Sequence, residues 1–490
     1  MRKNIKSFVE IENQTNCTST GYCALNPTIE IIEELFLNEI RQISYYVSKF
    51  PSSDFCDDVL LQELINTLAE NIFVTQPREN EVLSKLRGLI KLRNTTKKKY
   101  IDYCKKSMQG CETANFIFEP ELTWNYATYI EQAAKFIYVR NKIFTLQQLR
   151  YFELITLIAK VVAQIILKIK SYKKNFSDYD IRLLKFFSIT ALFYDSPTKI
   201  KRKILQFSRD IYEINKLYAS TLAEYFGERI NAKIRTSLLA GKSLLVAGSN
   251  LKELENILIA CKDTDINIYT NGDLYVAHTY EKFRKYKNLK GHIASGSTNY
   301  DFSNFDGVVF ITKFMSHKID QLYQGTIFSS SDVISKGMIK VENDDYSEIF
   351  KSIAMHPEAK QQGKPAYEII ELSQDNIEEL FSDNKNQIMI FVGKSKNNEL
   401  IAEFGDKKII NIEYQPDSDL FYKIVEKSSN TGVSVILFCS RCSAKIIADI
   451  VSVLSEKTIE EIYLVKCQTL NVNPHVVECL RDEFNVKIIE

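Results

Sequence analysis

Apolar residues recur with helical spacing through the first half of the chain. Asn26 and Pro27 supply an N-cap residue and a proline at the first helical position. Apolar side chains then follow at three- or four-residue intervals, at Ile32, Leu35, Phe36, Ile40, Ile43 and Val47. The same pattern predicts further helices over 58–73, 80–107, 124–139, 145–171, 179–193 and 199–226. Helices in direct succession predict an all-helical bundle.

The hydrophobic period changes after Gly241. Short apolar runs predict strands over 243–247, 266–270, 308–312, 388–392, 409–412, 433–438, 462–466 and 486–489. Amphipathic segments predict helices over 251–260, 445–455 and 475–483. Strands that alternate with helices favour parallel sheets covered on both faces, and the polar stretch 356–364 is the predicted linker. The expected fold class is multidomain α and α/β. A helical domain over 1–236 precedes two Rossmann-like α/β domains over 237–355 and 365–490.

Charge and composition change this picture little. The 490 residues are 26% charged with a net charge of +1, and the lysine run at 97–99 has no base-reading motif beside it, so no nucleic-acid partner is expected. The most apolar stretch, Leu154–Ile169, contains Lys160, Gln164 and Lys168, which predicts a half-buried helix and no membrane span. Ten cysteines without a visible secretion signal predict reduced thiols and a cytoplasmic location.

The order of motifs in the second half resembles one family. A strand ending in VAG (246–248) is followed by LKELE (251–255), NGDLYVAH (271–278), YKNLKGH (286–292) and FDGVVF (305–310), and NPHVVECLRDEFNV (473–486) closes the chain. This succession resembles the hybrid-cluster protein (hydroxylamine reductase, prismane) family, which is related to the carbon monoxide dehydrogenases. The resemblance implies a helical domain followed by two Rossmann-like domains. It also implies an N-terminal iron–sulfur cubane and an iron–sulfur–oxygen hybrid cluster.

The cubane of the family is held by four cysteines, and the chain keeps one pair of them. Cys17 and Cys23 match the second pair, whereas the first pair falls near Val9 and Glu12. Two thiolates do not complete a [4Fe–4S] site. Two idle thiols are one interpretation. The other is a [4Fe–4S] cluster shared across a homodimer, because a two-fold axis would bring four thiolates together.

The ligand positions of the hybrid cluster are almost all replaced. The resemblance places Ser249 at the histidine ligand and Asp273 at a glutamate ligand, so only Asp273 keeps a carboxylate for a metal. The remaining positions map to Phe314 or Met315, Ser395, the neighbourhood of Glu413, Asp417 and Ser443. Serine and aromatic side chains do not replace thiolates at iron. The expected state is therefore a protein without the hybrid cluster, with its former positions filled by side chains.

Other candidate motifs give weaker signals. Cys439 and Cys442 form a C-x2-C pair at a strand end, where two buried thiols, a structural zinc site and a redox dithiol are the alternatives. His278 matches a histidine of the family and is interpreted as a structural residue. The Gly-Lys-Ser triplets at 241 and 393 lack the earlier glycine of a P-loop.

Three functional hypotheses follow. The leading one is a degenerate family member, a non-catalytic pseudoenzyme that acts as a binding, scaffold or sensor protein with a protein partner. The alternative is an iron–sulfur oxidoreductase of the hydroxylamine or nitric oxide reductase type with a remodelled metal centre, built from Asp273, Asp417, His278 and the Cys439/Cys442 pair. In that hypothesis Cys17 and Cys23 would hold an electron-entry cluster. The third is a ligand-binding α/β module lined by Ser249, Asn271, Asp273 and Ser395. Metal content separates the first two, because an electron-transferring enzyme needs a centre that accepts electrons.

Overall fold

The computed structural model divides the chain into two compact units, each of which is described by itself below. The first unit combines Met1–Ile211 with Asn471–Phe484, and the second combines Tyr212–Leu470 with Asn485–Glu490. The residues described are 27–50, 58–70, 78–108, 114–173, 178–192, 195–293, 302, 305–313, 323, 325–361, 364–370, 388–392, 408–412, 421–426, 433–439, 445–456, 459–465 and 473–489.

The first unit is helical, as its sequence pattern predicts. Its helices are α2 (Pro27–Lys49), α3 (Asp58–Ala69), α4 (Glu79–Lys106), α5 (Tyr126–Ile143), α6 (Leu146–Lys170), α7 (Asp178–Phe187), the first part of α8 (Pro197–Phe226) and α15 (Pro474–Phe484). The predicted apolar stripe of α2 is buried at every position from Ile32 to Val47. Helix α2 packs against α4, α5 and α7, while α6 packs against α3, α7 and α15. Local signals set the ends. Asn125 caps α5, and Thr145 with Gln148 forms a capping box at α6.

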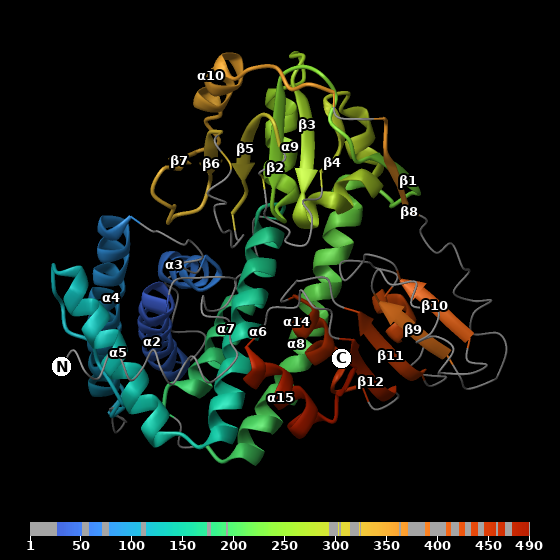
Figure 1. Ribbon diagram of the computed structural model, residues 1–490. Helices are drawn as coiled ribbons and strands as arrows, with labels where there is room; N and C mark the ends of the chain where they lie inside the picture. Colours follow the sequence, from blue (N-terminus) through green and yellow to red (C-terminus); the bar gives the residue numbers. More distant parts are fainter. Residues whose placement is uncertain are drawn as a thin grey trace. The chain divides into compact units, whose positions relative to one another are not determined.

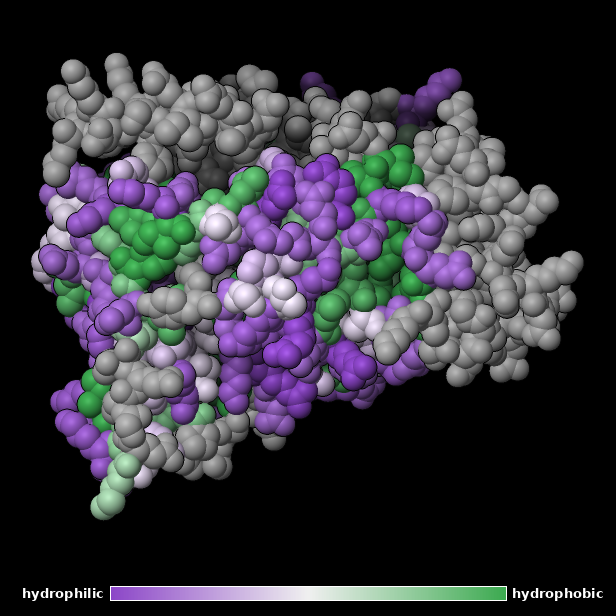
Figure 2. Space-filling model, turned by 90° about the horizontal axis from the view of Figure 1, so that it is seen from below, coloured by the Kyte–Doolittle hydropathy of each residue, from purple (hydrophilic) through white to green (hydrophobic). Residues whose placement is uncertain are grey.

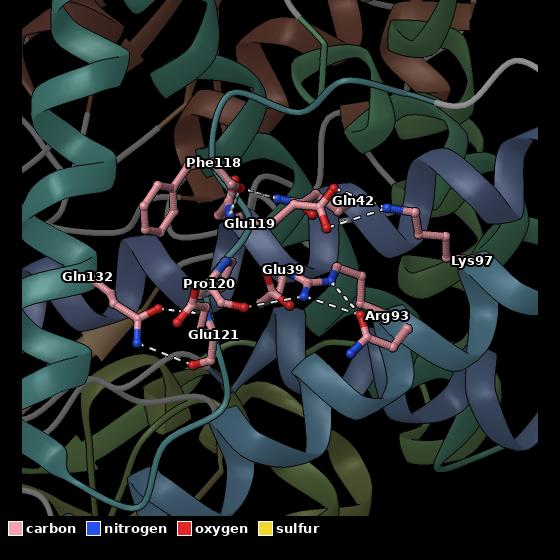
Figure 3. A network of polar contacts seen from close by, with 11 residues as sticks. Glu39, Gln42, Arg93, Lys97, Phe118, Glu119, Pro120, Glu121 and Gln132 are labelled. Carbon is pink, nitrogen blue, oxygen red and sulfur yellow. Dashed lines mark hydrogen bonds and ion pairs between the residues drawn. The ribbon is translucent and has the colours of Figure 1, made fainter.

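Residues 114–125, called here the connecting segment, form neither helix nor strand, yet helix side chains hold their backbone (Figure 3). The Phe118 carbonyl accepts hydrogen bonds from Asn38 (3.2 Å) and Gln42 (2.7 Å) of α2. The Pro120 carbonyl accepts one from Arg93 of α4 (3.3 Å), as Figure 3 shows. Gln132 of α5 pairs with both the backbone N–H and the carbonyl of Glu121. These bonds supply the partners that an irregular segment cannot supply for itself.

The last helix of the chain, α15, packs on α6 in the helical unit (Figure 1). Arg150 of α6 donates to Glu478 (2.9 Å) and to Asp482 (3.0 Å). Tyr151 donates to Glu483 (2.7 Å). The expected helix at 475–483 is thus present, and it lies with the N-terminal helices. The expected domain limits at 236, 355 and 365 stay a prediction.

The second unit contains two sheets among the described residues. The first sheet and its connections include the family-like motifs over 246–310. Its strands are β1 (Ala232–Arg235), β2 (Ser243–Ala247), β3 (Asn267–Asn271), β4 (Leu289–His292), β5 (Val308–Ile311), β6 (Ile327–Ser329), β7 (Ile339–Lys340) and β8 (Tyr367–Ile370). Their order is β7-β6-β5-β2-β3-β4-β1-β8, and only β8 runs antiparallel to its neighbour. Every residue of β2, β3 and β5 is buried, as expected of central parallel strands that are covered on both faces. Helices α9 (Leu251–Ala260) and α10 (Ser347–Met355) belong to this part of the chain.

The second sheet is entirely parallel. Its strands β9 (Ile388–Val392), β10 (Lys408–Ile412), β11 (Val433–Cys439), β12 (Ile459–Val465) and β13 (Lys487–Ile489) are ordered β10-β9-β11-β12-β13. Helix α14 (Lys445–Val453) precedes β12. At its start Lys445 donates to Asp449 (2.8 Å), which also accepts from Asn215 of α8 (3.2 Å). The multidomain α and α/β fold class is confirmed.

Close approach of β1 and β4 gives a prediction at Gly291. The carbonyl oxygen of Arg235, its partner in the parallel ladder, would lie 2.2 Å from a Cβ atom at Gly291. Gly291→Ala should therefore force the strands apart and lower the free energy of unfolding by about 1–3 kcal/mol. Urea denaturation followed by circular dichroism would measure it. Gly88→Ala in α4 is the matched control, because nothing lies within 4 Å of that Cβ position. Equal stability of both variants would contradict the close approach.

Along the helices that the structure describes, none combines the length and apolar character needed to cross a bilayer. On the face drawn in Figure 2, hydrophobic residues form separate areas among hydrophilic ones.

Candidate functional site at the carboxyl ends of the first sheet

The strand order creates a topological switch point beside β2. The chain leaves β2 for β3 on one side, whereas β5 pairs with β2 on the other side. In open α/β sheets the crevice at such carboxyl ends is the usual ligand site. Here it is bordered by Gly248–Asn250 after β2 and by Thr312 and Lys313 after β5. The Ser249 backbone N–H donates to the Thr312 hydroxyl (3.3 Å), so the two strand ends are directly linked.

Two glycines shape the turns at this edge. Gly248 has φ 134° and Gly272 has φ 70°, both in regions that favour glycine. The Gly248 N–H donates to the Asn271 carbonyl (3.2 Å), and the Gly248 carbonyl accepts from Leu274 (3.0 Å). A Cβ atom at Gly272 would lie 3.2 Å from the Gly248 oxygen. The ends of β2 and β3 are therefore held together through backbone groups.

A buried carboxylate, Glu253 of α9, joins three elements at the switch point. Asn250 is the N-cap of α9, and its side chain donates to Glu253 Oε1 (2.9 Å). The Lys313 backbone N–H (3.2 Å) and the Ser330 hydroxyl (2.7 Å) both donate to Glu253 Oε2. Because Lys313 follows β5 and Ser330 follows β6, Glu253 ties both strand ends to the start of α9.

The capping of α9 argues against an anionic ligand at this edge. Burial raises the pKa of Glu253 to about 7, and the bonds from Ser330 and the Lys313 N–H oppose that rise. A helix N-terminus attracts phosphate when its N–H groups are available. Here the Asn250 side chain already accepts from the N–H groups of Lys252 (3.1 Å) and Glu253 (3.4 Å). At this edge of the sheet, the polar groups of the chain are therefore hydrogen-bonded to one another around Glu253.

A second polar cluster lies between β3 and β4. The Thr270 hydroxyl is 2.9 Å from His278 Nε2 and 3.0 Å from His292 Nδ1. The Tyr275 ring packs edge-on against His292, with ring centroids 4.8 Å apart. Burial lowers the pKa of His278 to about 4, so the imidazole is neutral at physiological pH. His278 thus has the hydrogen-bonded surroundings expected of a structural residue.

The structure places two of the residues expected at former ligand positions. Ser249 is half-buried in the turn after β2, and Asp273 is exposed at the start of the 3₁₀ helix Gly272–Thr279. Cys439 is the last residue of β11, as expected for a strand end. Outside the described residues lie Cys17, Cys23, Phe314, Met315, Ser395, Asp417, Cys442 and Ser443.

The described residues of this site do not fit a cluster of the hybrid type. Ser249 and Asp273 offer hard oxygen donors, whereas iron–sulfur clusters are held mainly by thiolates. Cys104, Cys261 and Cys479 are buried and form no disulfide. Burial raises the pKa of Cys261 to about 12, which keeps that thiol protonated. Among the residues that the structure describes, no three His, Cys, Asp or Glu side chains are grouped to hold a metal ion.

Sequence reasoning overlooked Glu253 and the Thr270–His292 pair. The signal for Glu253 was present, because Asn250 followed three residues later by a glutamate is a capping pattern. Its partners Lys313 and Ser330 lie far along the chain and leave no local signal.

Comparison with known proteins identifies the family. The hydroxylamine reductase of Methanocella arvoryzae is 29% identical over 147 residues, which cover 30% of this chain and 27% of that protein. The hydroxylamine reductase of Zymomonas mobilis is 23% identical over 345 residues, covering 69% of this chain and 61% of that protein. The matches thus span between about a quarter and three fifths of these relatives.

Two solved structures align with nearly the whole chain at low sequence identity. An acetyl-CoA synthase/carbon monoxide dehydrogenase shares 9% identity and a TM-score of 0.44, covering 96% of this chain and 82% of that chain. Carbon monoxide dehydrogenase from Thermococcus sp. AM4 shares 10% identity and a TM-score of 0.43, covering 96% of this chain and 84% of that chain. The model of the Prismane/CO dehydrogenase family matches residues 12–478. The chain therefore belongs to the Prismane/CO dehydrogenase family.

Proposed function

We propose that this chain is a cluster-free member of its iron–sulfur oxidoreductase family and acts by binding a protein partner, as a scaffold or sensor subunit. Glu253 carries the proposal. Its carboxylate joins α9 to the ends of β5 and β6, so the chain's own polar groups bond to one another where the family would place metal ligands. Ser249 at the same edge adds a hydroxyl and no soft donor.

The second candidate is an iron–sulfur oxidoreductase, and family membership together with relatives named hydroxylamine reductase favours it. In that case the metal would come to residues beyond those described here, including Cys17 and Cys23. A homodimer sharing one [4Fe–4S] cluster between two such pairs would be its simplest form.

Metal analysis distinguishes the candidates. We expect protein purified under strict anaerobiosis to contain negligible iron and acid-labile sulfide and to lack the broad visible absorption of iron–sulfur clusters. The physical reason is the shortage of thiolate ligands at the mapped positions. Iron, zinc and sulfide assays with an absorption spectrum would measure it. The double variant Cys17→Ser/Cys23→Ser is the matched control, because it removes the retained pair alone.

Other outcomes would overturn the cluster-free proposal in distinct ways. About two irons per chain, lost in the Cys17→Ser/Cys23→Ser variant, would establish a cluster shared by two chains. Substantially more iron, retained in that variant, would make the oxidoreductase the leading candidate.

A further inference from the structure

The first sheet ends in an open strand edge at β8. Strand β8 is last in the strand order and pairs with β1 (Figure 1). The Thr236 N–H donates to the Ala366 carbonyl (2.9 Å), just beyond the paired residues of the two strands. Hydrogen-bonded pairs alternate along an antiparallel ladder, so the backbone groups of Glu368 face β1 and those of Tyr367 and Ile369 point away from it. No other strand of the described ranges takes up these outward N–H and C=O groups.

The side chains of Tyr367 and Ile369 share one face of the sheet, and that face is open to water. Tyr367 is 48% exposed and Ile369 is 64% exposed. In the register of the two strands they lie opposite Arg235 and Lys233 of β1, so all four side chains project to the same side. We call these four residues the β8 edge. Open backbone groups beside exposed apolar side chains are the features by which a sheet accepts a further strand.

Two cations of the β8 edge are held over its aromatic ring. Lys233 Nζ lies 4.5 Å from the centre of the Tyr367 ring, and Arg235 Cζ lies 5.5 Å from it. Arg235 also donates to the Ser237 hydroxyl (3.4 Å). Among the described residues, no carboxylate forms an ion pair with either cation. The β8 edge therefore presents two positive charges without an ion-pair partner.

The acidic residue of β8 does not neutralise these charges. Glu368 alternates with Tyr367 and Ile369 and lies opposite Ile234, so its side chain projects from the other face of the sheet. The positive charge also extends towards the centre of the sheet. Burial raises the pKa of Tyr269, and the charge of Arg235 opposes that rise. The complement of the β8 edge is therefore an acidic group on the same face.

Charge also decides between a second copy of the chain and a different partner. Two β8 strands paired antiparallel about a two-fold axis would keep the same face of both sheets on one side. Each copy would then add Lys233 and Arg235 to that side, and like charges on neighbouring strands are unfavourable. An added strand with acidic side chains on this face places opposite charges together instead.

We propose that the β8 edge binds an extended segment of a partner protein, which adds a strand to the first sheet and presents aspartate or glutamate to Lys233 and Arg235. The backbone of that segment would bond to Tyr367 and Ile369, and its apolar side chains would cover the exposed side chains of the same two residues. This inference rests on the binding role proposed above, because it names the surface and the chemistry of the partner.

A displayed library of random decapeptides, selected against the full chain and counter-selected on the double variant Lys233→Gln/Arg235→Gln, tests the charge. We expect enriched peptides to carry aspartate or glutamate at alternate positions of a segment rich in β-branched or aromatic residues. A labelled synthetic copy of an enriched peptide is then titrated, with fluorescence anisotropy as the readout. The double variant should weaken its binding roughly five- to tenfold at low salt, and less at high salt.

Two changes to backbone amides test the addition of a strand. The Ile369 N–H points away from β1, so Ile369→Pro removes an outward donor and leaves the bonds between β8 and β1 in place. It should weaken binding roughly tenfold or more at every salt concentration. The peptide is also made in two forms, N-methylated at its odd or at its even residues. Because every second amide of an added strand faces β8, one form should bind the parent protein and the other should not.

Matched controls separate the β8 edge from general surface effects. The double variant Lys262→Gln/Lys351→Gln removes two cations of the same unit whose side chains are 67% and 64% exposed. It should leave the affinity unchanged. Thermal melting of each variant shows whether folding is retained, and the N-methylated peptides keep the test valid if Ile369→Pro does not fold.

Enrichment of peptides without acidic residues, equal binding of the two N-methylated forms, or failure to enrich any peptide would overturn the inference. Sedimentation equilibrium that shows a dimer of the parent protein, lost in Ile369→Pro, would overturn it in favour of a second copy. The metal assays are independent of these outcomes. An iron–sulfur cluster in the protein would defeat the cluster-free function and leave strand addition at the β8 edge standing.

Discussion

Replacing Arg93 by alanine is expected to lower the free energy of unfolding by about 3–5 kcal/mol near pH 9. Arg93 Nη1 lies 3.0 Å from Glu39 Oε1, and the two side chains are 4% and 0% exposed. Removing the cation would leave the Glu39 carboxyl buried without its partner, so it must either stay charged there or take up a proton at a cost that grows with pH. The same substitution deletes the bond from Arg93 to the Pro120 carbonyl and so loosens the connecting segment. Urea denaturation followed by circular dichroism measures the loss.

The loss should shrink as the pH falls. Burial raises the pKa of Glu39 to about 8, although the Arg93 guanidinium opposes that rise. At about pH 6 the carboxyl therefore takes up a proton, and the variant no longer buries a charge.

Two comparisons show whether the effect comes from the buried charge. The double variant Glu39→Leu/Arg93→Met removes both charges and should be far less destabilised than Arg93→Ala. Lys97→Ala breaks the neighbouring pair with Glu119, whose side chains are 31% and 35% exposed, and should change stability by at most about 1 kcal/mol. If the double variant is as unstable as Arg93→Ala, lost packing rather than charge burial is responsible.

The second large effect is a pair of opposing pH dependences at the edge of the first sheet. Burial raises the pKa of Glu253 from 4.5 to about 7 and lowers that of His278 from 6.5 to about 4. The stability that Glu253 contributes is fully present below its unfolded pKa and is lost as the pH rises through 7. The contribution of His278 is present above its unfolded pKa of 6.5 and is lost as the pH falls through 4. Each amounts to about 3 kcal/mol at most.

Single substitutions should show how much each residue contributes to the pH dependence of the free energy of unfolding. Relative to Glu253→Gln, the parent protein should lose stability as the pH rises from about 4.5 to 7. Relative to His278→Gln, it should gain stability as the pH rises from about 4 to 6.5. Urea denaturation at several pH values in this window measures both differences. Stability curves of the two variants that run parallel to the parent curve would refute the assigned protonation states.

The sequence pattern predicted elements well where one local rule decides them. The stripe from Ile32 to Val47 is a buried helix face, and the apolar run at 243–247 is a buried parallel strand. The connecting segment could not be foreseen, because its anchors Asn38 and Gln42 lie 80 and 76 residues away from Phe118. The spacing of apolar residues predicted helix α15, but that spacing carries no information on which helix α15 packs against, and its neighbour is α6.

In the candidate site, too, local sequence predicted some features, whereas contacts between distant residues could not be predicted. The family motifs located Ser249 and Asp273, and both residues lie beside the glycine turns that follow β2 and β3. The hydrogen bonds to Glu253 come from Lys313 and Ser330, which follow β5 and β6 and approach Glu253 only after the sheet has formed. The loss of the hybrid cluster and the role of Cys17 and Cys23 stay predictions that the metal assays decide.

The return of α15 to the helical unit constrains how the protein is made. Residues 471–484 complete a unit that begins at the N-terminus, and all of Tyr212–Leu470 is synthesised between these two parts. When α6 leaves the ribosome, the carboxylates of α15 that accept hydrogen bonds from Arg150 and Tyr151 have not yet been synthesised. The surface of α6 that α15 covers is therefore open to chaperones or to solvent until α15 has been synthesised. The helical unit therefore begins before residues 212–470 and is completed only after them, in contrast to the usual order in which an N-terminal domain folds before the next one is made.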